Sequence, residues 1–118
     1  MQILTWNVQW CCGLDGVVDP ERIVRHAMAM GNAAGGDVDV LCLQEVAVGH
    51  GGLQGAPGDQ VAQLRALLPD WQVFFAATTD GFDAAGQRRR FGNVVATRLP
   101  VAEMAQHRLP WRAEAGIV

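Results

Sequence analysis

A nearly continuous apolar run over residues 38–46 restricts the fold of this chain more than any other feature. The run reads Val-Asp-Val-Leu-Cys-Leu-Gln-Glu-Val, and glycines flank it on both sides. Its length and composition predict a strand that is buried on both faces, as in the middle of an α/β sheet. The run carries a carboxylate, Glu45, near its end, and open α/β sheets bind ligands beyond the carboxyl ends of their strands. We therefore expect a candidate ligand site at Glu45.

Shorter runs elsewhere predict the other strands of this sheet. β-Branched and aromatic residues dominate these runs, and both types favour strands. The strands are expected over residues 2–9, 71–77, 90–97 and 103–108. A polar turn over residues 79–86 is expected to join the second and third of these strands as a hairpin.

Two helices are expected between the strands. The first covers residues 20–30, because an aspartate N-cap, a proline and a glutamate open it and Gly31 follows it. The second covers residues 59–68, with Asp59 as its N-cap. The order β-α-β-α-β-β-β predicts a single α/β domain over residues 1–118, with a mixed β-sheet and helices on one face.

The composition excludes several kinds of chemistry. The 118 residues include no Ser, no Lys and no Tyr, so all nine basic residues are Arg. Serine-based acyl transfer, Schiff-base chemistry, a P-loop lysine and a tyrosine nucleophile are therefore excluded. The net charge of -3 argues against a general electrostatic attraction to nucleic acid or to an anionic membrane.

The first residues and the cysteines predict a cytoplasmic protein without a membrane partner. Residues 1–6 lack the basic and apolar regions of a signal peptide, and no apolar run approaches the roughly 20 residues that span a bilayer. The three cysteines, Cys11, Cys12 and Cys42, do not form a disulfide framework. A cysteine-based redox or metal module is an alternative, although no Cys-x-x-Cys or histidine spacing supports it.

Asn7 and Glu45 are polar residues near the ends of otherwise apolar strands. If the two strands are neighbours, both side chains lie at the same carboxyl edge of the sheet. An amide oxygen and one carboxylate are a poor acid–base pair, but they are a reasonable partial shell for Mg²⁺, which keeps several waters. Alternatively, Glu45 is a helix cap or a solvated strand end and Asn7 is a turn residue.

Arg88, Arg89 and Arg90 form a run of three positive charges. Near a phosphate site such a run would attract an anionic substrate. Strand alternation would point Arg89 away from the other two, so Arg88 and Arg90 are the candidate substrate-binding residues. The alternative is a solvated charge run. His50, in the glycine-rich loop after Glu45, is either close to the site or an exposed loop residue.

Three ordered segments resemble the endonuclease/exonuclease/phosphatase superfamily, which has the DNase I-like fold. They read T-W-N-V at residues 5–8, D-V-L-C-L-Q-E-V at residues 39–46 and F-G-N-V-V-A-T-R-L-P-V at residues 91–101. The resemblance implies a phosphoesterase that depends on Mg²⁺ or Mn²⁺ and hydrolyses a phosphodiester or a phosphomonoester. It also implies half of a four-layer α/β sandwich, in which two sheets pack face to face.

The resemblance assigns roles to individual residues. Glu45 matches the family's metal-binding glutamate, and Asn7 matches the first-strand asparagine of its metal and phosphate site, so both are candidate catalytic and metal-ligating residues. Gly92 and Asn93 match a segment beside that site. Asn93 is therefore a candidate substrate-binding residue or, alternatively, the donor of a strand-edge hydrogen bond. Thr97 stands where the family usually has Ser.

The three segments cover only the first half of such a domain. The second half of the family fold carries a catalytic histidine, an Asp-x-Asn segment and a terminal Asp-His pair, and none of these occurs in this sequence. We expect the N-terminal part of a phosphoesterase that is inactive alone on its phosphate-ester substrate. An uncovered sheet face favours a homo-oligomer. The alternative function is a self-associating half-domain without a hydrolytic role.

Overall fold

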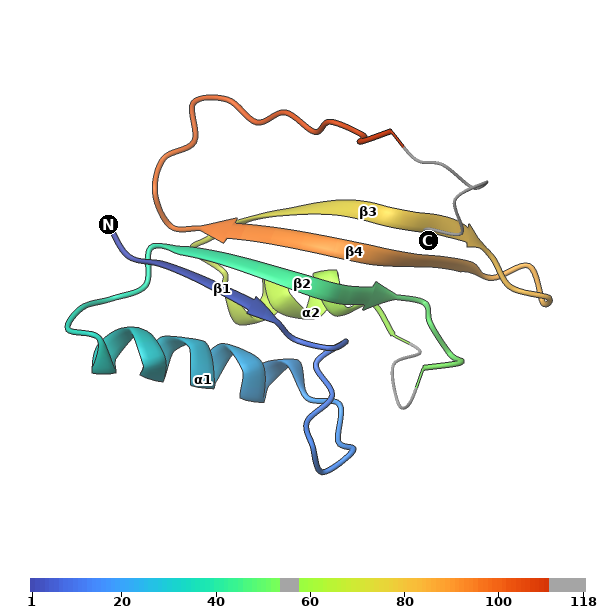
Figure 1. The fold of residues 1–118 in the computed structure, drawn as a ribbon, viewed down its shortest axis with the longest axis horizontal. Coiled ribbons are helices and arrows are strands. Elements are labelled where there is room, and N and C mark those ends of the chain that lie inside the picture. The colour runs from blue at the N-terminus through green and yellow to red at the C-terminus, as the bar shows by residue number, and fades with distance from the viewer. Residues whose placement is uncertain (54–57, 111–118) are drawn as a thin grey trace.

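The computed structural model describes residues 1–53 and 58–110. The four strands of this part of the chain form one mixed sheet in the order β1-β2-β4-β3 (Figure 1). Strand β1 runs parallel to β2, whereas β4 is antiparallel to both β2 and β3. The elements in chain order are β1 (Ile3–Asn7), α1 (Pro20–Ala33), β2 (Val40–Val48), α2 (Gln60–Leu67), β3 (Gln72–Phe82) and β4 (Arg88–Thr97). The predicted α/β fold with a mixed sheet is confirmed.

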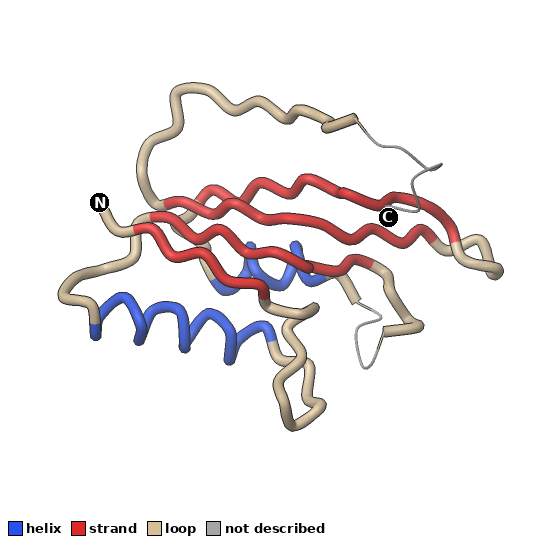
Figure 2. Tube along the Cα trace, viewed as in Figure 1, coloured by secondary structure: helices blue, strands red, loops and turns tan. Residues whose placement is uncertain are grey.

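Both helices lie on the same side of the sheet (Figure 1 and Figure 2). We call the face that they cover the inner face and the opposite face the outer face. The strand registers align the residues of each face in rows across the four strands. The inner face carries the rows Leu4–Leu41–Ala96–Val73 and Trp6–Leu43–Val94–Phe75. The outer face carries the rows Ile3–Val40–Thr97–Gln72 and Thr5–Cys42–Val95–Phe74.

The hydrophobic core lies between the inner face and the helices. Leu41 and Leu43 of β2 are completely or almost completely buried there, as is Leu64 of α2. Each buried leucine stabilises the fold by about 1.5–3 kcal/mol relative to an exposed one. The buried residues that the helices contribute to this core are Ile23, Val24, Ala27, Val61 and Leu64.

The helix starts follow the sequence prediction, and one helix end does not. The side chains of Asp19 and Asp59 accept hydrogen bonds from backbone N–H groups in the first turns of α1 and α2. The expected end of the first helix at Gly31 is wrong, because α1 continues through Gly31 to Ala33. An added Cβ at Gly31 would clash with the side chain of Val38. Close packing therefore explains this glycine better than helix termination does.

The hairpin between β3 and β4 is longer than the sequence predicted. The polar turn expected over residues 79–86 is wrong, since β3 continues to Phe82 and β4 begins at Arg88. Two bonds from the Arg88 guanidinium to the Asp80 carboxylate, of 2.9 and 2.7 Å, join the extended strands. The Asp83 carboxylate accepts bonds from two backbone N–H groups and closes the shorter turn.

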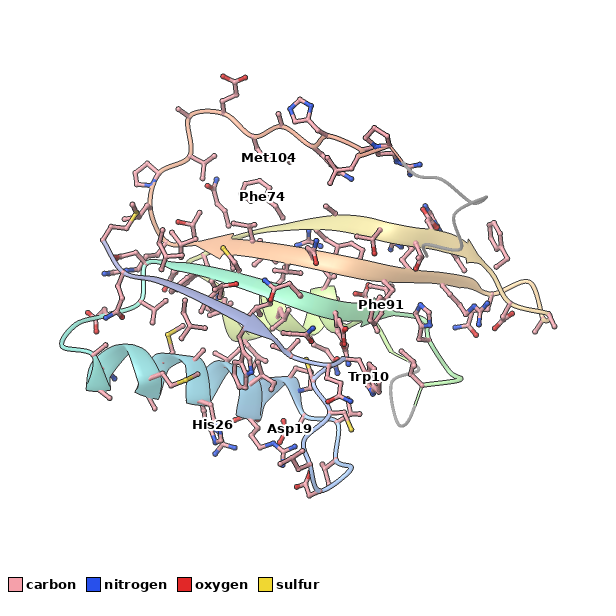
Figure 3. The ribbon with its side chains drawn as sticks, in the orientation of Figure 1. Trp10, Asp19, His26, Phe74, Phe91 and Met104 are labelled. Carbon is pink, nitrogen blue, oxygen red and sulfur yellow. The ribbon has the colours of Figure 1, made fainter. Side chains whose placement is uncertain are left out.

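The final strand expected over residues 103–108 is absent. Residues 102–110 are exposed and contain no helix or strand. In Figure 1 this segment turns back on the side of the sheet away from the helices, and Figure 3 shows Phe74 on that same side, facing the stretch around Met104. Met104 is 56% exposed, so the segment does not pack as a layer on the outer face. Among the described residues, no helix is long and apolar enough to cross a membrane.

Candidate functional site

A β-bulge interrupts β2 at the candidate ligand residue. Gln44 and Glu45 of β2 together stand opposite a single residue of β4, Asn93. Glu45 has a φ of 60°, the left-handed conformation that side chains rarely adopt. A bulge turns the following residues and is common next to active sites, where it redirects a side chain. The strand predicted over residues 38–46 is thus irregular at Glu45, the residue for which the sequence predicts a ligand site.

The turn after β1 has the same unusual conformation. Gln9, Trp10 and Cys11 have φ values of 50°, 43° and 57°. Apart from these three and Glu45, no non-glycine residue within the described ranges has a positive φ. The Trp10 N–H donates a 2.7 Å hydrogen bond to the Glu45 carbonyl, so the two left-handed segments are directly joined. Each such residue costs of order 1–3 kcal/mol, and these conformations cluster at functional sites.

Asn7 ends β1 beside the bulge. Asn7 pairs with Gln44 in the parallel register, and the next residue, Val8, donates its N–H to the Gln44 carbonyl at 3.0 Å. The expectation that the strands of Asn7 and Glu45 are neighbours is therefore confirmed. By strand alternation Asn7 and Asn93 both belong to the outer face. We call Asn7, Glu45 and Asn93 the bulge site.

Gly92 permits a second bulge on the other side of β4. Strand β3 carries one extra residue, Thr78, at this level. An added Cβ on Gly92 would clash with the Ala76 carbonyl and would approach the Ala77 Cα to 2.8 Å. The Gly-Asn pair of the third sequence segment thus has two roles: Gly92 admits the bulged backbone of β3, and Asn93 faces the bulged backbone of β2.

Thr97 lies at the end of the sheet opposite to the bulge site, where its hydroxyl forms two hydrogen bonds. Its hydroxyl donates to the Asp39 carbonyl at 3.2 Å and accepts a bond from the Leu99 N–H at 3.0 Å. The side chain is buried. Serine has the same hydroxyl, so threonine at this position keeps a structural hydrogen bond.

Arg88 and Arg90 do not join the bulge site. The Arg90 guanidinium lies 5.7 Å from the ring centroid of Phe75, which belongs to the inner face. Arg88 is paired with Asp80 at 2.7 Å, and this hydrogen bond holds the pKa of the Asp80 carboxyl below its usual value. Strand alternation places the third arginine, Arg89, on the outer face with Asn93. Because side chains alternate between the two faces of a strand, the spacing of four residues from Asn93 predicts Arg89 as the arginine on the same face.

His50 lies on the outer-face side, close to Phe91 of β4. The two rings meet edge to face with centroids 5.7 Å apart. Burial lowers the pKa of His50, and the positive charge of Arg89 lowers it further. His50 is therefore a half-buried residue beside Phe91, not a fully exposed loop residue. In Figure 3, Phe91 lies at the same end of the sheet as Trp10, the residue bonded to Glu45.

The donor atoms of the bulge site suit a hard divalent cation but do not complete its shell. The site offers one carboxylate and two amide oxygens, and Mg²⁺ binds through oxygen ligands while retaining several waters. The Asn7 Oδ1 already accepts a 3.1 Å bond from the Gln9 N–H, which leaves one lone pair free. Residues 1–53 and 58–110 contain no group of three or more His, Cys, Asp or Glu side chains that could hold a metal.

Comparison with known proteins gives one match. A sequence model of the endonuclease/exonuclease/phosphatase family matches residues 4–115, a range that includes all of the bulge site. No curated protein and no solved structure matches the chain.

Proposed function

This chain belongs to the endonuclease/exonuclease/phosphatase family, and on that premise we propose that it carries part of the metal-binding site of a Mg²⁺-dependent phosphoesterase. The observation that carries the proposal is the bulge site, where the strand registers bring the backbone of Asn7, Glu45 and Asn93 to the same level of three neighbouring strands. Mn²⁺ satisfies the same oxygen donors and serves as the experimental substitute.

The three residues have different roles in this proposal. Glu45 supplies the anionic ligand, and the Asn7 amide oxygen supplies a neutral one. A bound Mg²⁺ would polarise a phosphoryl oxygen and offset the charge that develops on it. Asn93 would donate its amide N–H to the phosphate ester. Arg89, on the same face, is the arginine we now favour for attracting that anionic substrate, in place of Arg88 and Arg90.

Cation binding to the 118-residue chain tests this proposal. Mn²⁺ enhances water proton relaxation when it binds a protein, so a titration measures its affinity directly. Glu45→Gln keeps the shape of the side chain and removes the charge, and it should abolish the enhancement. Glu103→Gln, the same change in the exposed segment after β4, is the matched control and should leave it intact. Equal enhancement in both variants would refute the assignment of Glu45.

We also propose that this chain alone does not hydrolyse phosphate esters. The bulge site contains a single titratable group, Glu45, and hydrolysis also needs a group that activates water. Loss of one member of a catalytic unit typically costs several orders of magnitude in rate. With Mg²⁺ or Mn²⁺, hydrolysis of bis-p-nitrophenyl phosphate and of p-nitrophenyl phosphate should stay at background. Turnover that disappears in Glu45→Gln would overturn this expectation.

Self-association through the outer face is the second candidate function, because the outer-face rows contain no charged residue. Ile3 is 57% exposed and Val95 is 43% exposed on this face. We propose that a second copy of the chain covers it. Sedimentation equilibrium at micromolar concentration should show a dimer, which Val95→Lys should dissociate. Leu14→Lys, in the loop after β1, should not. A wild-type chain that remains a monomer would exclude the proposal.

The cysteines support a cytoplasmic location, which we propose as the compartment of the protein. Cys11, Cys12 and Cys42 are all free. Burial raises the pKa of the Cys11 thiol to about 12, which keeps the group protonated, and the thiolate is the form that reacts. Such unpaired thiols are typical of a reducing compartment. Thiol titration of the unfolded protein, purified without reductant, should find three groups. Fewer than three would contradict the proposal.

A further inference from the structure

Gln60, the first residue of α2, has a buried side-chain amide whose oxygen and nitrogen are both hydrogen-bonded. It is 1% exposed, although glutamine is usually a surface residue. Its Oε1 accepts a 3.0 Å bond from the Ala47 N–H, and its Nε2 donates a 2.7 Å bond to the Trp10 carbonyl. One partner can only donate and the other can only accept, so the orientation of the amide is unambiguous.

The two partners of Gln60 flank the bulge site. Ala47 follows Glu45 by two residues on β2, at a level where β1 has already ended at Asn7 and offers no ladder partner. Trp10 lies in the left-handed turn after β1 and donates its own N–H to the Glu45 carbonyl. Gln60 therefore adds a second connection between the two strained segments, besides the direct bond from Trp10 to Glu45. A buried N–H or C=O without a partner would cost about 1–3 kcal/mol.

The position of Gln60 is set by α2 and not by the bulge. The side chain of the preceding residue, Asp59, caps the helix, and Asp59 also forms an isolated bridge with Val48. Val61 and Leu64 are buried in the core. These contacts fix the start of the helix, so the Gln60 amide is held in place independently of the two backbone groups that it binds.

We propose that Gln60 is a positioning residue, whose side chain holds the Glu45 bulge against the left-handed turn after β1. It touches neither a cation nor a substrate. In one respect this role rests on the proposed function, namely that Glu45 is a cation ligand: by fixing the backbone of Ala47 and of Trp10, the residue bonded to the Glu45 carbonyl, Gln60 would fix the backbone that carries the Glu45 carboxylate. Residues that orient metal ligands typically change metal affinity 10–100-fold when they are replaced.

Amide hydrogen exchange of the 118-residue chain tests this role without any metal. Gln60→Met keeps the length of the side chain and removes both hydrogen bonds. Gln63→Met, the same change at an exposed position of α2, is the matched control. The informative amide is Trp10, whose acceptor is the untouched Glu45 carbonyl. Its protection should fall about tenfold or more relative to the buried Val94 amide in Gln60→Met, and should not change in Gln63→Met.

A purely stabilising role would give a different result. Trp10 and Val94 would then lose protection by the same factor, and that outcome, or unchanged protection at Trp10, overturns the proposal. If Gln60→Met does not fold, Gln60→Asn gives the same comparison, since its shorter side chain cannot reach both partners.

Mn²⁺ affinity provides the second readout. We expect at least a tenfold loss in Gln60→Met under conditions where the variant is folded, and no loss in Gln63→Met. Unchanged Mn²⁺ affinity in Gln60→Met would show that Gln60 does not position Glu45. If the wild-type chain binds no Mn²⁺, the metal-binding proposal fails, and hydrogen exchange at Trp10 alone then decides the role of Gln60.

Discussion

The inner and outer faces of the sheet are built from alternate residues of the same strands, yet they differ in almost every property. On β4, Val94 of the inner face is 1% exposed, whereas its neighbour Val95 on the outer face is 43% exposed. The helices cover only the inner face (Figure 2). Buried apolar area is therefore concentrated on the inner face, whereas no helix covers the outer face. Substitutions at adjacent residues of one strand can therefore separate the contributions of the two faces.

The two faces also differ at the level of the bulge. The inner face continues with the buried apolar residues Val46 and Val48 past the irregularity. The outer face carries Asn7 and Asn93 at this level, on the two strands that flank the bulged strand of Glu45. The strained backbone conformations occur at the same level. The strained backbone thus adjoins the buried core, to which Cys11 of the left-handed turn itself belongs.

The largest expected effect comes from truncating the two faces at matched positions. Leu43→Ala, on the inner face, should lower the free energy of unfolding by about 2–5 kcal/mol, because it leaves a cavity in the core. Val95→Ala, on the outer face, should lower it by less than about 1 kcal/mol at protein concentrations where the chain is a monomer. Urea unfolding followed by tryptophan fluorescence measures both. Equal losses would mean that the outer face is buried as deeply as the inner one.

A smaller loss of stability is expected at Gly92, the residue beside the bulge of β3. Gly92→Ala introduces a Cβ against the Ala76 carbonyl and should cost about 1–3 kcal/mol, as overpacking typically does. Gly81→Ala is the matched control in β3, since nothing lies within 4 Å of its added Cβ. The control should be neutral or slightly stabilising in the same urea experiment. A harmless Gly92→Ala would show that β3 does not need its bulge.

The smallest effect concerns pH and the end of the sheet opposite to the bulge site. The Gln2 N–H donates a 2.7 Å bond to the Asp39 carboxylate, and Arg98 pairs with it at 2.6 Å. Both interactions hold the pKa of Asp39 below its usual value. Their stabilisation is complete above the unfolded-state pKa of about 3.9 and is lost as the pH falls through the lower folded-state pKa.

Asp39→Asn isolates this contribution. The difference in unfolding free energy between wild type and variant should be constant above about pH 5 and should shrink below about pH 4. Urea titrations at a series of pH values measure it. A difference that grows on acidification would contradict the direction of the shift.

Local sequence patterns were sufficient for the parts of the fold that depend on local chemistry. The apolar run of β2 and the aspartate caps of both helices could be predicted, because burial and capping each favour particular residue types at neighbouring positions. The neighbouring placement of Asn7 and the Glu45 strand also followed, since parallel strands bring their carboxyl ends to one edge.

The bulges, the left-handed turn and Gln60 could not be predicted in the same way. A bulge is a mismatch between two strands, and Asn93 lies far from Glu45 in the sequence, so no local pattern encodes it. Gln60 occupies the first turn of a helix, where polar residues usually face water. The alternation of Arg88, Arg89 and Arg90 is correct, but the arginine run by itself does not indicate which face is the outer one; only the spacing from Asn93 assigns Arg89 to it.

Paramagnetic broadening by Mn²⁺ in the NMR spectrum of the 118-residue chain tests most directly whether the outer face carries a cation site. At the lowest Mn²⁺ concentrations, the side-chain amide signals of Asn7 and Asn93 should broaden first, while that of Asn32 on α1 stays sharp. The selective broadening should disappear in Glu45→Gln. Broadening that centres elsewhere, or that persists in Glu45→Gln, would contradict the assignment of the bulge site as the metal-binding end of the sheet.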